Sequence, residues 1–230
     1  MRLDKFISSA TDLTRSQVRR AVKAGLVTVN GNSGVRVSDQ VTETDTVCLE
    51  RQQLPFPGPR YFMLHKPIGV VSATKDSDNP TVIDLLDEPN KEQLQIAGRL
   101  DIDTTGLVLI TDDGQWNHRV TSPRRDCQKT YYVTTVSDIS PETGERFAEG
   151  VQLDGEKRPT LPAQLDLLYS NEARLTISEG KYHQVKRMFA AVGNRVESLH
   201  RERIGDIHLD PSLEPGEYRP LTQTEIDAIH

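Results

Sequence analysis

A proline-rich segment at residues 52–59 is the feature that most constrains how this chain can fold. The segment reads Gln-Gln-Leu-Pro-Phe-Pro-Gly-Pro. Proline lacks the amide hydrogen that a helix or a central strand requires, so we expect neither element to run through it. Such a stretch is typical of a semi-rigid linker. The sequence therefore predicts two domains, residues 1–59 including the linker and residues 60–230.

The composition is that of a folded protein. The chain has 230 residues, of which 35% are hydrophobic and 27% charged, and this is enough to bury a core. The longest apolar run, residues 188–192, is far shorter than the roughly 20 residues of a membrane span. The first residues lack a signal-peptide core, and two cysteines are too few for a disulfide framework. We therefore expect a cytoplasmic protein with no membrane partner.

Positive charge is concentrated in three parts of an acidic chain. The net charge is −6, yet residues 1–30, 115–131 and 178–203 each carry more basic than acidic side chains. Such segments are typical of a face that binds phosphates, and they are also found as ordinary solvated faces. Charge alone leaves nucleic-acid binding open.

The first 50 residues predict a small α/β module. Thr14 and Gln17 form a capping-box pattern for a helix over residues 14–24, which Gly25 can end. Residues 26–31 predict a strand that enters an Asn-Gly turn, and residues 35–37 and 46–49 predict further short strands. With Arg-Leu-Asp-Lys at residues 2–5, this order resembles the S4 RNA-binding domain. The resemblance implies that basic side chains of this domain contact RNA, namely Arg2, Lys5, Arg15, Arg19, Arg20 and Lys23.

Residues 60–230 predict a larger α+β domain. Strands are expected at residues 61–64, 107–111, 129–136, 163–168, 174–178 and over most of 196–209. Helices are expected at residues 80–86, 140–149 and 183–192, and from residue 222. The elements do not alternate as βαβ units, so we predict a mixed, largely antiparallel sheet.

The sequence contains no cofactor or metal signature. It has no phosphate-binding loop, no dinucleotide fingerprint and no nucleophile elbow. None of its six histidines lies four residues from another, as zinc ligands on a helix often do. We therefore expect neither a cofactor nor a metal.

A polar turn at residues 98–106 precedes the most apolar strand of the chain. It reads Gly-Arg-Leu-Asp-Ile-Asp-Thr-Thr-Gly, and a lone Asp in such a turn most often bonds its own backbone. Three later segments accompany it, Thr-Asp-Asp-Gly at 111–114, Lys-Thr-Tyr at 129–131 and Glu-Gly-Lys-Tyr-His-Gln-Val-Lys-Arg-Met at 179–188. In this order they resemble the motifs of the pseudouridine synthases. Together with the S4-like domain, they resemble the RsuA family of these enzymes.

The resemblance implies an isomerase that breaks the N1–C1′ bond of a uridine and joins C5 to C1′. One ionised carboxylate is needed, as a nucleophile at C1′ or as a base at C2′, and the resemblance implies Asp101. Lys186, where many relatives have Arg, would keep that carboxylate ionised. Tyr131 would stack on the flipped base, whereas Tyr132 points to the other face of the strand. No cofactor is implied.

Other side chains are candidates for RNA contact, and each could instead brace a loop or cap a helix. Those implied near the reacting uridine are Arg99, Thr105, His183, Gln184 and Arg187. Basic candidates elsewhere in the larger domain are Arg119, Arg124, Lys181 and Arg201.

We therefore predict an isomerase that converts a uridine of 16S ribosomal RNA, free or in an assembling small subunit, to pseudouridine. One alternative is the same reaction on 23S ribosomal RNA. Another is a non-catalytic RNA-binding assembly factor, which explains the basic segments but not the set of Asp101, Tyr131 and Lys186. No amphipathic stripe is left for a protein partner, so we expect a monomer.

Overall fold

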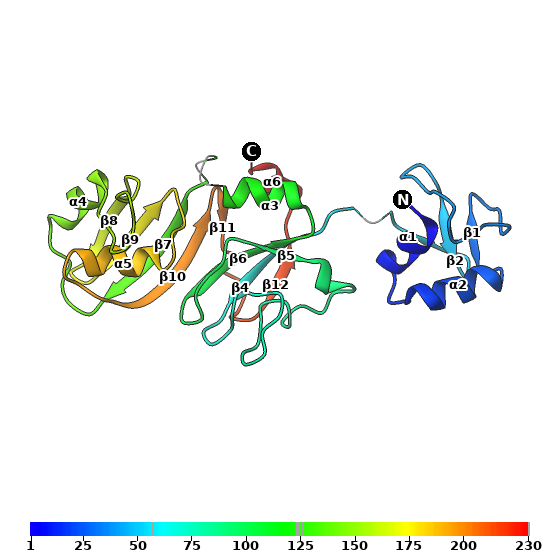
Figure 1. Cartoon of the computed structure of the whole chain (residues 1–230), viewed down its shortest axis with the longest axis horizontal. Helices are drawn as coiled ribbons and strands as arrows, with labels where there is room; N and C mark the ends of the chain where they lie inside the picture. Colours follow the sequence, from blue (N-terminus) through cyan, green and yellow to red (C-terminus); the bar gives the residue numbers. More distant parts are fainter. Residues whose placement is uncertain (57, 123–124, 126, 230) are drawn as a thin grey trace. The chain divides into compact units, whose positions relative to one another are not determined.

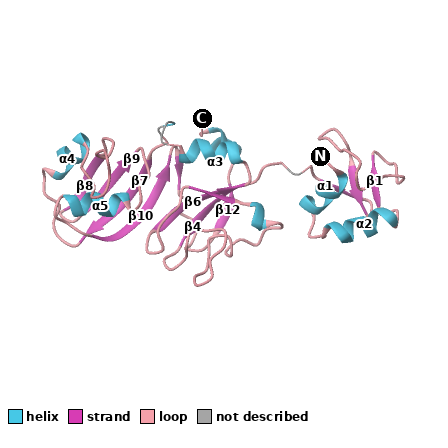
Figure 2. Cartoon of the chain, in the orientation of Figure 1, coloured by secondary structure: helices cyan, strands magenta, loops and turns pink. Residues whose placement is uncertain are grey.

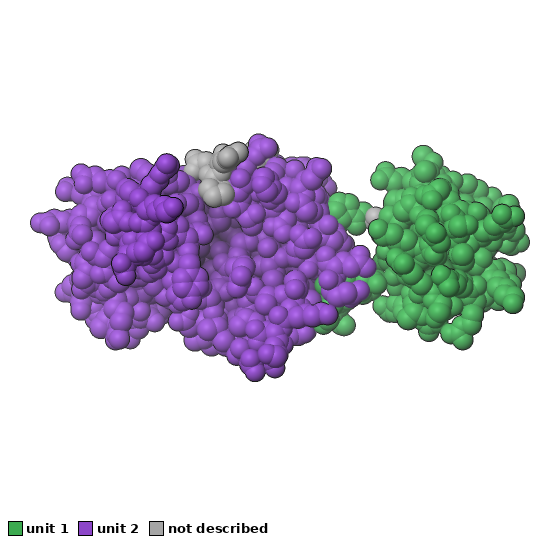
Figure 3. All heavy atoms as spheres, viewed as in Figure 1, with its two compact units in different colours: residues 1–59, 87–91 green, residues 60–86, 92–230 purple. Residues whose placement is uncertain are grey.

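The computed structural model describes residues 1–56, 58–122, 125 and 127–229. It divides into two compact units, which are coloured separately in Figure 3 and whose elements are labelled in Figure 1. Unit 1 comprises residues 1–59 and 87–91, and unit 2 comprises residues 60–86 and 92–230. Among the described residues, none of the helices is long and apolar enough to cross a bilayer.

Unit 1 consists of two helices and a three-stranded antiparallel sheet. The helices are α1 (Leu3–Ala10) and α2 (Arg15–Lys23), and the strands are β1 (Val27–Val29), β2 (Val47–Leu49) and β3 (Gln52–Leu54), in that order. The capping box of α2 is present, because the Thr14 amide donates to Gln17 Oε1 at 2.7 Å and the Gln17 amide to Thr14 Oγ1 at 3.3 Å. The small α/β module is confirmed.

Two local predictions for unit 1 are wrong. Residues 35–37 are not a strand, because the Val37 carbonyl accepts from the Asp4 amide at 3.0 Å and so ties this segment to α1 instead of to a sheet. Strand β3 lies in the segment expected to be a linker, since its three residues precede the first proline and their amides are free to pair with β2.

Unit 2 is built on one mixed sheet of nine strands (Figure 2). The strands are β4 (Tyr61–Lys66), β5 (Gln95–Ala97), β6 (Thr105–Thr111), β7 (Lys129–Thr135), β8 (Gln164–Tyr169), β9 (Glu172–Ile177), β10 (Val196–Ile204), β11 (Ile207–His208) and β12 (Tyr218–Pro220). Their order is β12-β4-β6-β10-β7-β9-β8, with β5 on β6 and β11 on β10. Among these pairs β6–β10 is parallel and the rest are antiparallel. The mixed, largely antiparallel α+β prediction is confirmed.

Helices cover both faces of the sheet (Figure 1). They are α3 (Gly114–Thr121), α4 (Thr143–Glu149), α5 (Gln184–Ala191) and α6 (Gln223–Asp227), with a 3₁₀ turn η1 (Lys91–Gln93). Alternation along β6 sends Val108 and Ile110 into the core that contains α4 and α5 residues. Leu107 and Leu109 enter the core on the opposite face, with Trp116 of α3. The sheet therefore has a buried layer on each side.

The helix expected at residues 80–86 is absent. The Asp84 carboxylate accepts from the Thr81 amide at 2.9 Å and from the Thr81 hydroxyl at 2.8 Å. This side-chain turn takes the place of a helical first turn. Residues 80–86 are instead a turn whose apolar side chains, such as Val82 and Leu86, enter the core.

Gly106 lies where β6 and β10 pair in parallel, opposite Arg201. Its φ is +107°, and a Cβ there would lie 2.3 Å from the Arg201 carbonyl oxygen. Glycine is the residue that fits both conditions. This contact joins the half of the sheet that leads to Asp101 to the half that carries Tyr131.

Candidate active site

Asp101 lies in the loop between β5 and β6. Gly98, with φ +94°, lets the chain turn after β5. The Leu100 side chain is buried, and its amide donates to Ser72 Oγ at 3.0 Å. The Thr104 amide donates to the Asp101 carbonyl at 3.1 Å and closes a tight turn. The loop is therefore anchored on both sides of Asp101, whose side chain stays 31% exposed.

Lys186 lies in α5, and its side chain reaches the loop that carries Asp101. Its Nζ lies 3.3 Å from Asp101 Oδ2 and 2.5 Å from Asp103 Oδ1. The hydrogen bond from Lys186 is the main cause that lowers the pKa of Asp103. The predicted pairing of Lys186 with Asp101 is present, but the lysine is shared with Asp103, which the sequence analysis did not single out. The spacing of Asp101 and Asp103, with one residue between them, could have indicated that both carboxylates lie near the same cation.

His183 is a third group at the carboxylate. Its Nε2 lies 3.5 Å from Asp101 Oδ1. The residue precedes α5 with a left-handed backbone, φ 48° and ψ 35°, which is uncommon for a residue with a side chain. The Tyr182 ring is stacked on the His183 ring, with centroids 3.8 Å apart.

Tyr131 lies in β7 with 8% of its surface exposed, in the core beside α5. Tyr132 faces the other way and donates its hydroxyl to Glu172, as strand alternation requires. The Tyr131 hydroxyl lies 3.4 Å from Arg201 Nη1, and the guanidinium carbon lies 5.9 Å from the ring centroid. Arg201 therefore links Tyr131 to the loop of Asp101.

The structure corrects the expectation that Arg201 is a surface RNA contact. The side chain is 1% exposed, so RNA phosphates cannot reach it. Its Nε donates to the Leu107 carbonyl at 2.8 Å and its Nη2 to the Gly98 carbonyl at 2.6 Å, while Nη1 lies 3.3 Å from the Arg99 carbonyl. Arg201 holds the loop of Asp101 from within the protein.

A second buried cation, Lys66, holds the other side of the same loop. Its Nζ donates to the carbonyls of Thr104 at 2.8 Å and Pro67 at 3.0 Å, and lies 3.4 Å from that of Ile102. Burial lowers the pKa of Lys66 to about 8, against the opposing effect of Asp103 and Asp101. The sequence analysis missed this residue. Its signal was a charged residue at the end of an apolar strand, directly before a proline.

Three side chains predicted to contact RNA instead hold the turn before α5, and their partners among the described residues do not include Asp101. Gln184 is 4% exposed, accepts from the Lys181 amide at 2.8 Å and donates to Glu179 at 3.0 Å. Arg187 pairs with Glu156 at 3.1 Å, and Lys181 pairs with the same carboxylate at 3.5 Å. These three side chains are thus engaged inside the protein.

The other predicted residues are spread over the surface. Arg99, next to Asp101 in sequence, is exposed, and Arg119 in α3 is half-buried. Arg124 lies outside the described residues. In unit 1 the predicted RNA contacts are all exposed, namely Arg2, Lys5, Arg15, Arg19, Arg20 and Lys23. Arg2 pairs with Asp4 at 2.9 Å.

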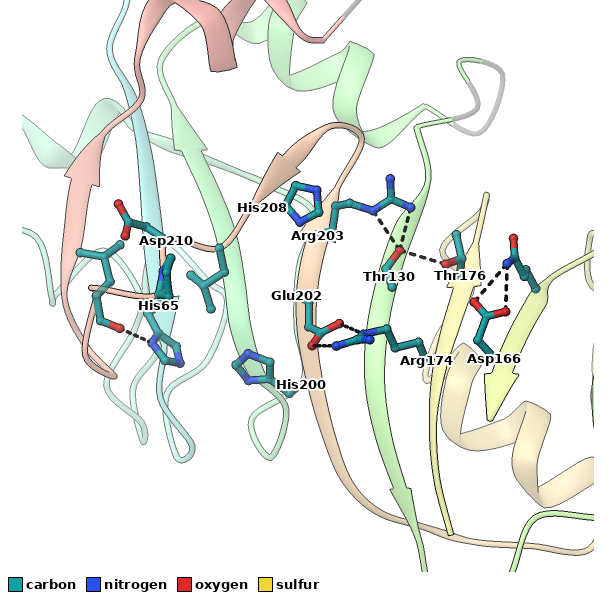
Figure 4. Close-up of a pocket in the computed structure, with 14 residues that line it drawn as sticks. His65, Thr130, Asp166, Arg174, Thr176, His200, Glu202, Arg203, His208 and Asp210 are labelled. Atoms are coloured by element: carbon teal, nitrogen blue, oxygen red, sulfur yellow. Dashed lines mark hydrogen bonds and ion pairs between the residues drawn. The ribbon is translucent and has the colours of Figure 1, made fainter. Parts of the chain in front are cut away.

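A groove of about 680 Å³ lies on a different part of unit 2 (Figure 4). Arg174 pairs with Glu202 there at 2.8 Å, and Arg203 donates to Thr130 Oγ1 at 3.0 Å. His200 in this groove bonds Thr105 Oγ1 at 2.8 Å, so the Thr105 hydroxyl is turned toward it. Asp101, Tyr131 and Lys186 do not line the groove.

Comparisons with known proteins cover the whole chain. Residues 60–191 match the model of the RNA pseudouridylate synthase family, and residues 1–47 match that of the S4 domain. The chain is 57% identical to "Ribosomal small subunit pseudouridine synthase A" of Yersinia pestis, over all of this chain and 98% of that protein. It is 54% identical to the protein of that name from Escherichia coli strain K12, over the full length of both.

A solved structure agrees with this. A crystal structure described as pseudouridylate synthase has 50% sequence identity and a TM-score of 0.73, and covers all of both chains. Asp101, Tyr131 and Lys186 all lie within the residues that match the family model.

Proposed function

This chain belongs to the RNA pseudouridylate synthase family, and from that premise we propose that it converts a uridine of 16S ribosomal RNA to pseudouridine. It is a pseudouridine synthase of the small-subunit type by its similarity to curated relatives over its full length. The names of those relatives support a small-subunit RNA as substrate, either free or in an assembling particle. The observation that carries the proposal is the approach of Lys186 and His183 to the Asp101 carboxylate.

We propose that Asp101 is the reacting group. An ionised carboxylate is the form needed for attack at C1′ or for proton removal at C2′, and the Lys186 ammonium lies 3.3 Å from Asp101 Oδ2. Either route breaks the N1–C1′ bond, leaves its electron pair on uracil and forms the C5–C1′ bond, after which C5 loses its proton and N1 gains one. On the nucleophilic route the Asp101–C1′ bond that forms first breaks when C5 attacks C1′, and on the base route the proton taken from C2′ is returned there. The reaction is an isomerisation, so atoms and electrons balance without a co-reactant.

Tyr131 and the basic side chains have binding roles in this proposal. Tyr131, which is 8% exposed, contacts the base once it has left its stack. Arg99, exposed beside Asp101, contacts a flanking phosphate. The basic side chains of α2 and the start of α1 bind the RNA backbone. Gln184, Arg187 and Lys181 support the turn before α5. We keep the expectation of a monomer.

The test is to map pseudouridine in unmodified 16S and 23S ribosomal RNA, each incubated with wild-type protein or with Asp101→Asn. Asparagine keeps the size of the side chain but can act neither as nucleophile nor as base. We expect a new pseudouridine in 16S RNA with the wild type and none with the variant, while RNA binding is retained. Asp103→Asn is the matched control, because it removes the neighbouring carboxylate on Lys186 and should lower the rate without abolishing it.

The other outcomes are equally informative. Full activity of Asp101→Asn would refute the assigned mechanism. A site found only in 23S RNA would refute the substrate and keep the reaction. No product from either RNA, or from assembling particles, would favour the non-catalytic assembly factor.

A further inference from the structure

We propose that Tyr182 is a stacking platform for an unpaired nucleobase of the substrate RNA beside the reacting uridine. This inference rests on the proposed function, because it names how that substrate is held. The ring of Tyr182 is 75% exposed, although tyrosine is a side chain that gains by burial. A single exposed aromatic residue is ordinary on a protein surface, but the position of this ring and the contacts that hold it are not.

The Tyr182 ring is stacked on His183, whose edge nitrogen contacts the candidate catalytic carboxylate. His183 Nε2 lies 3.5 Å from Asp101, and the rings of Tyr182 and His183 are stacked with centroids 3.8 Å apart and planes inclined by 21°. The layer spacing resembles that of stacked bases. A base lying on the free face of Tyr182 would therefore be one ring away from His183, the residue that contacts the carboxylate, and a neighbour of the reacting uridine fits there.

The backbone that carries the Tyr182 ring is held by several hydrogen bonds and ion pairs. Arg187 Nη1 donates to the Tyr182 carbonyl at 3.0 Å, and its Nη2 donates to the Asp154 carbonyl at 2.5 Å. Glu156 binds both Arg187 and Lys181, so the residues on either side of the ring are tied to one loop. His183 adopts a left-handed backbone, an arrangement that persists only when its surroundings hold it. A pre-organised platform loses little conformational entropy on binding.

The chemistry of the reaction creates the ligand that this platform fits. When a uridine leaves its stack, the neighbouring base loses a partner on one face. Aromatic side chains bind such faces irrespective of base identity, because every base has one. Two exposed isoleucines belong to the Asp101 loop and to the turn that is hydrogen-bonded to it. Ile102 follows Asp101 and is 41% exposed, and Ile68 is 68% exposed in the turn whose Gly69 amide donates to the Ile102 carbonyl.

The test is the affinity for a short single-stranded RNA that contains one uridine, measured in the Asp101→Asn background so that no turnover occurs. Tyr182→Ala is expected to weaken binding about tenfold, the effect typical of losing one base–aromatic stack. Tyr182→Phe keeps the ring and is expected to restore the affinity. Binding of a fully paired RNA duplex should change little, because its bases are not free to stack.

Tyr169 provides the matched control. It is a tyrosine of similar exposure, 71%, at the end of β8 and outside the stack at Asp101. Tyr169→Ala should bind single-stranded RNA as the parent protein does. Equal affinities for Tyr182→Ala and the parent, or equal losses for the two alanine variants, would overturn the inference. A wild-type protein that forms no pseudouridine would instead overturn the proposed function, and the binding comparison would still decide whether Tyr182 stacks on RNA.

Discussion

Replacing Gly106 by alanine should destabilise unit 2 more than replacing a glycine that also has a positive φ but has open space around it. Gly106 has φ +107°, so an alanine there carries a backbone strain of order 1–3 kcal/mol. A Cβ would also lie 2.3 Å from the carbonyl oxygen and 2.6 Å from the nitrogen of Arg201. Both are backbone atoms, so the clash cannot be relieved by rotating a side chain.

The clash has to be relieved by opening the parallel pairing of β6 with β10. That pairing joins Thr105 to His200 and Gly106 to Arg201. Losing one or two of its hydrogen bonds costs about 1 kcal/mol each. Together with the strain, the expected loss in the free energy of unfolding is about 2–5 kcal/mol, a large part of the stability of a typical domain.

Urea unfolding followed by tryptophan fluorescence measures this loss. The chain has one tryptophan, Trp116, which is 1% exposed in the core of unit 2, so its emission reports on that unit. Gly216→Ala is the control, because Gly216 has φ +98° but nothing within 4 Å of an added Cβ. In Gly216→Ala, the free energy of unfolding should fall only by the backbone strain, about 1–3 kcal/mol. Equal losses for the two variants would refute the argument that the β6–β10 contact requires glycine.

Two further predictions concern charge. Replacing Arg15, Arg19 and Arg20 by alanine should reduce the slope of log binding constant against log salt by about 2, since each lost phosphate contact to single-stranded RNA removes about 0.7; an unchanged slope in a salt titration would show that these side chains do not bind phosphates. In unit 2, the hydrogen bonds from Arg219 lower the pKa of Glu225 to about 2. A carboxyl pKa that is lower in the folded state stabilises the protein above about pH 4.5, and this contribution is lost as the pH falls toward 2. Glu225→Gln should therefore cost about 1–2 kcal/mol at pH 7 after allowance for solvent screening, and the difference from wild type in urea unfolding should shrink at pH 3; a constant difference would contradict the assignment.

The sequence correctly predicted features that depend on residues close together in the chain, namely a helix cap, a turn and the alternation of side chains along a strand. The capping box at Thr14 depends on residues three positions apart, and it is present as expected. The turn at Asn30 and Gly31 has two left-handed residues, which is what an Asn-Gly pair favours. Strand alternation predicted that Tyr131 and Tyr132 point to opposite faces of the sheet, and they do.

Contacts between distant residues could not be predicted in this way. Arg201 appeared to be one more basic residue in a charged segment, yet it is buried against the Leu107 carbonyl, 94 residues away. Lys66 is similarly buried against main-chain carbonyls of the Asp101 loop. Backbone carbonyls carry no sequence signature, so the sequence can suggest that a cation such as Lys66 is buried but not which carbonyls it binds. The helix expected at residues 80–86 failed for a related reason, because Asp84 can close a turn as readily as it can sit in a helix.

The strand order also determines when the two units can be completed during synthesis. Every residue of unit 1 lies within the first 91, so this unit can form while the ribosome is still translating unit 2. The sheet of unit 2 is closed by β12, whose Tyr218 pairs with Leu64 of β4, and the Asp101 loop is not fixed until Arg201 has been made. At about 5–20 residues per second, unit 1, whose first 47 residues match the S4 domain, can be folded for several seconds before the candidate active site is complete. A nascent chain that binds RNA during that interval cannot yet modify it.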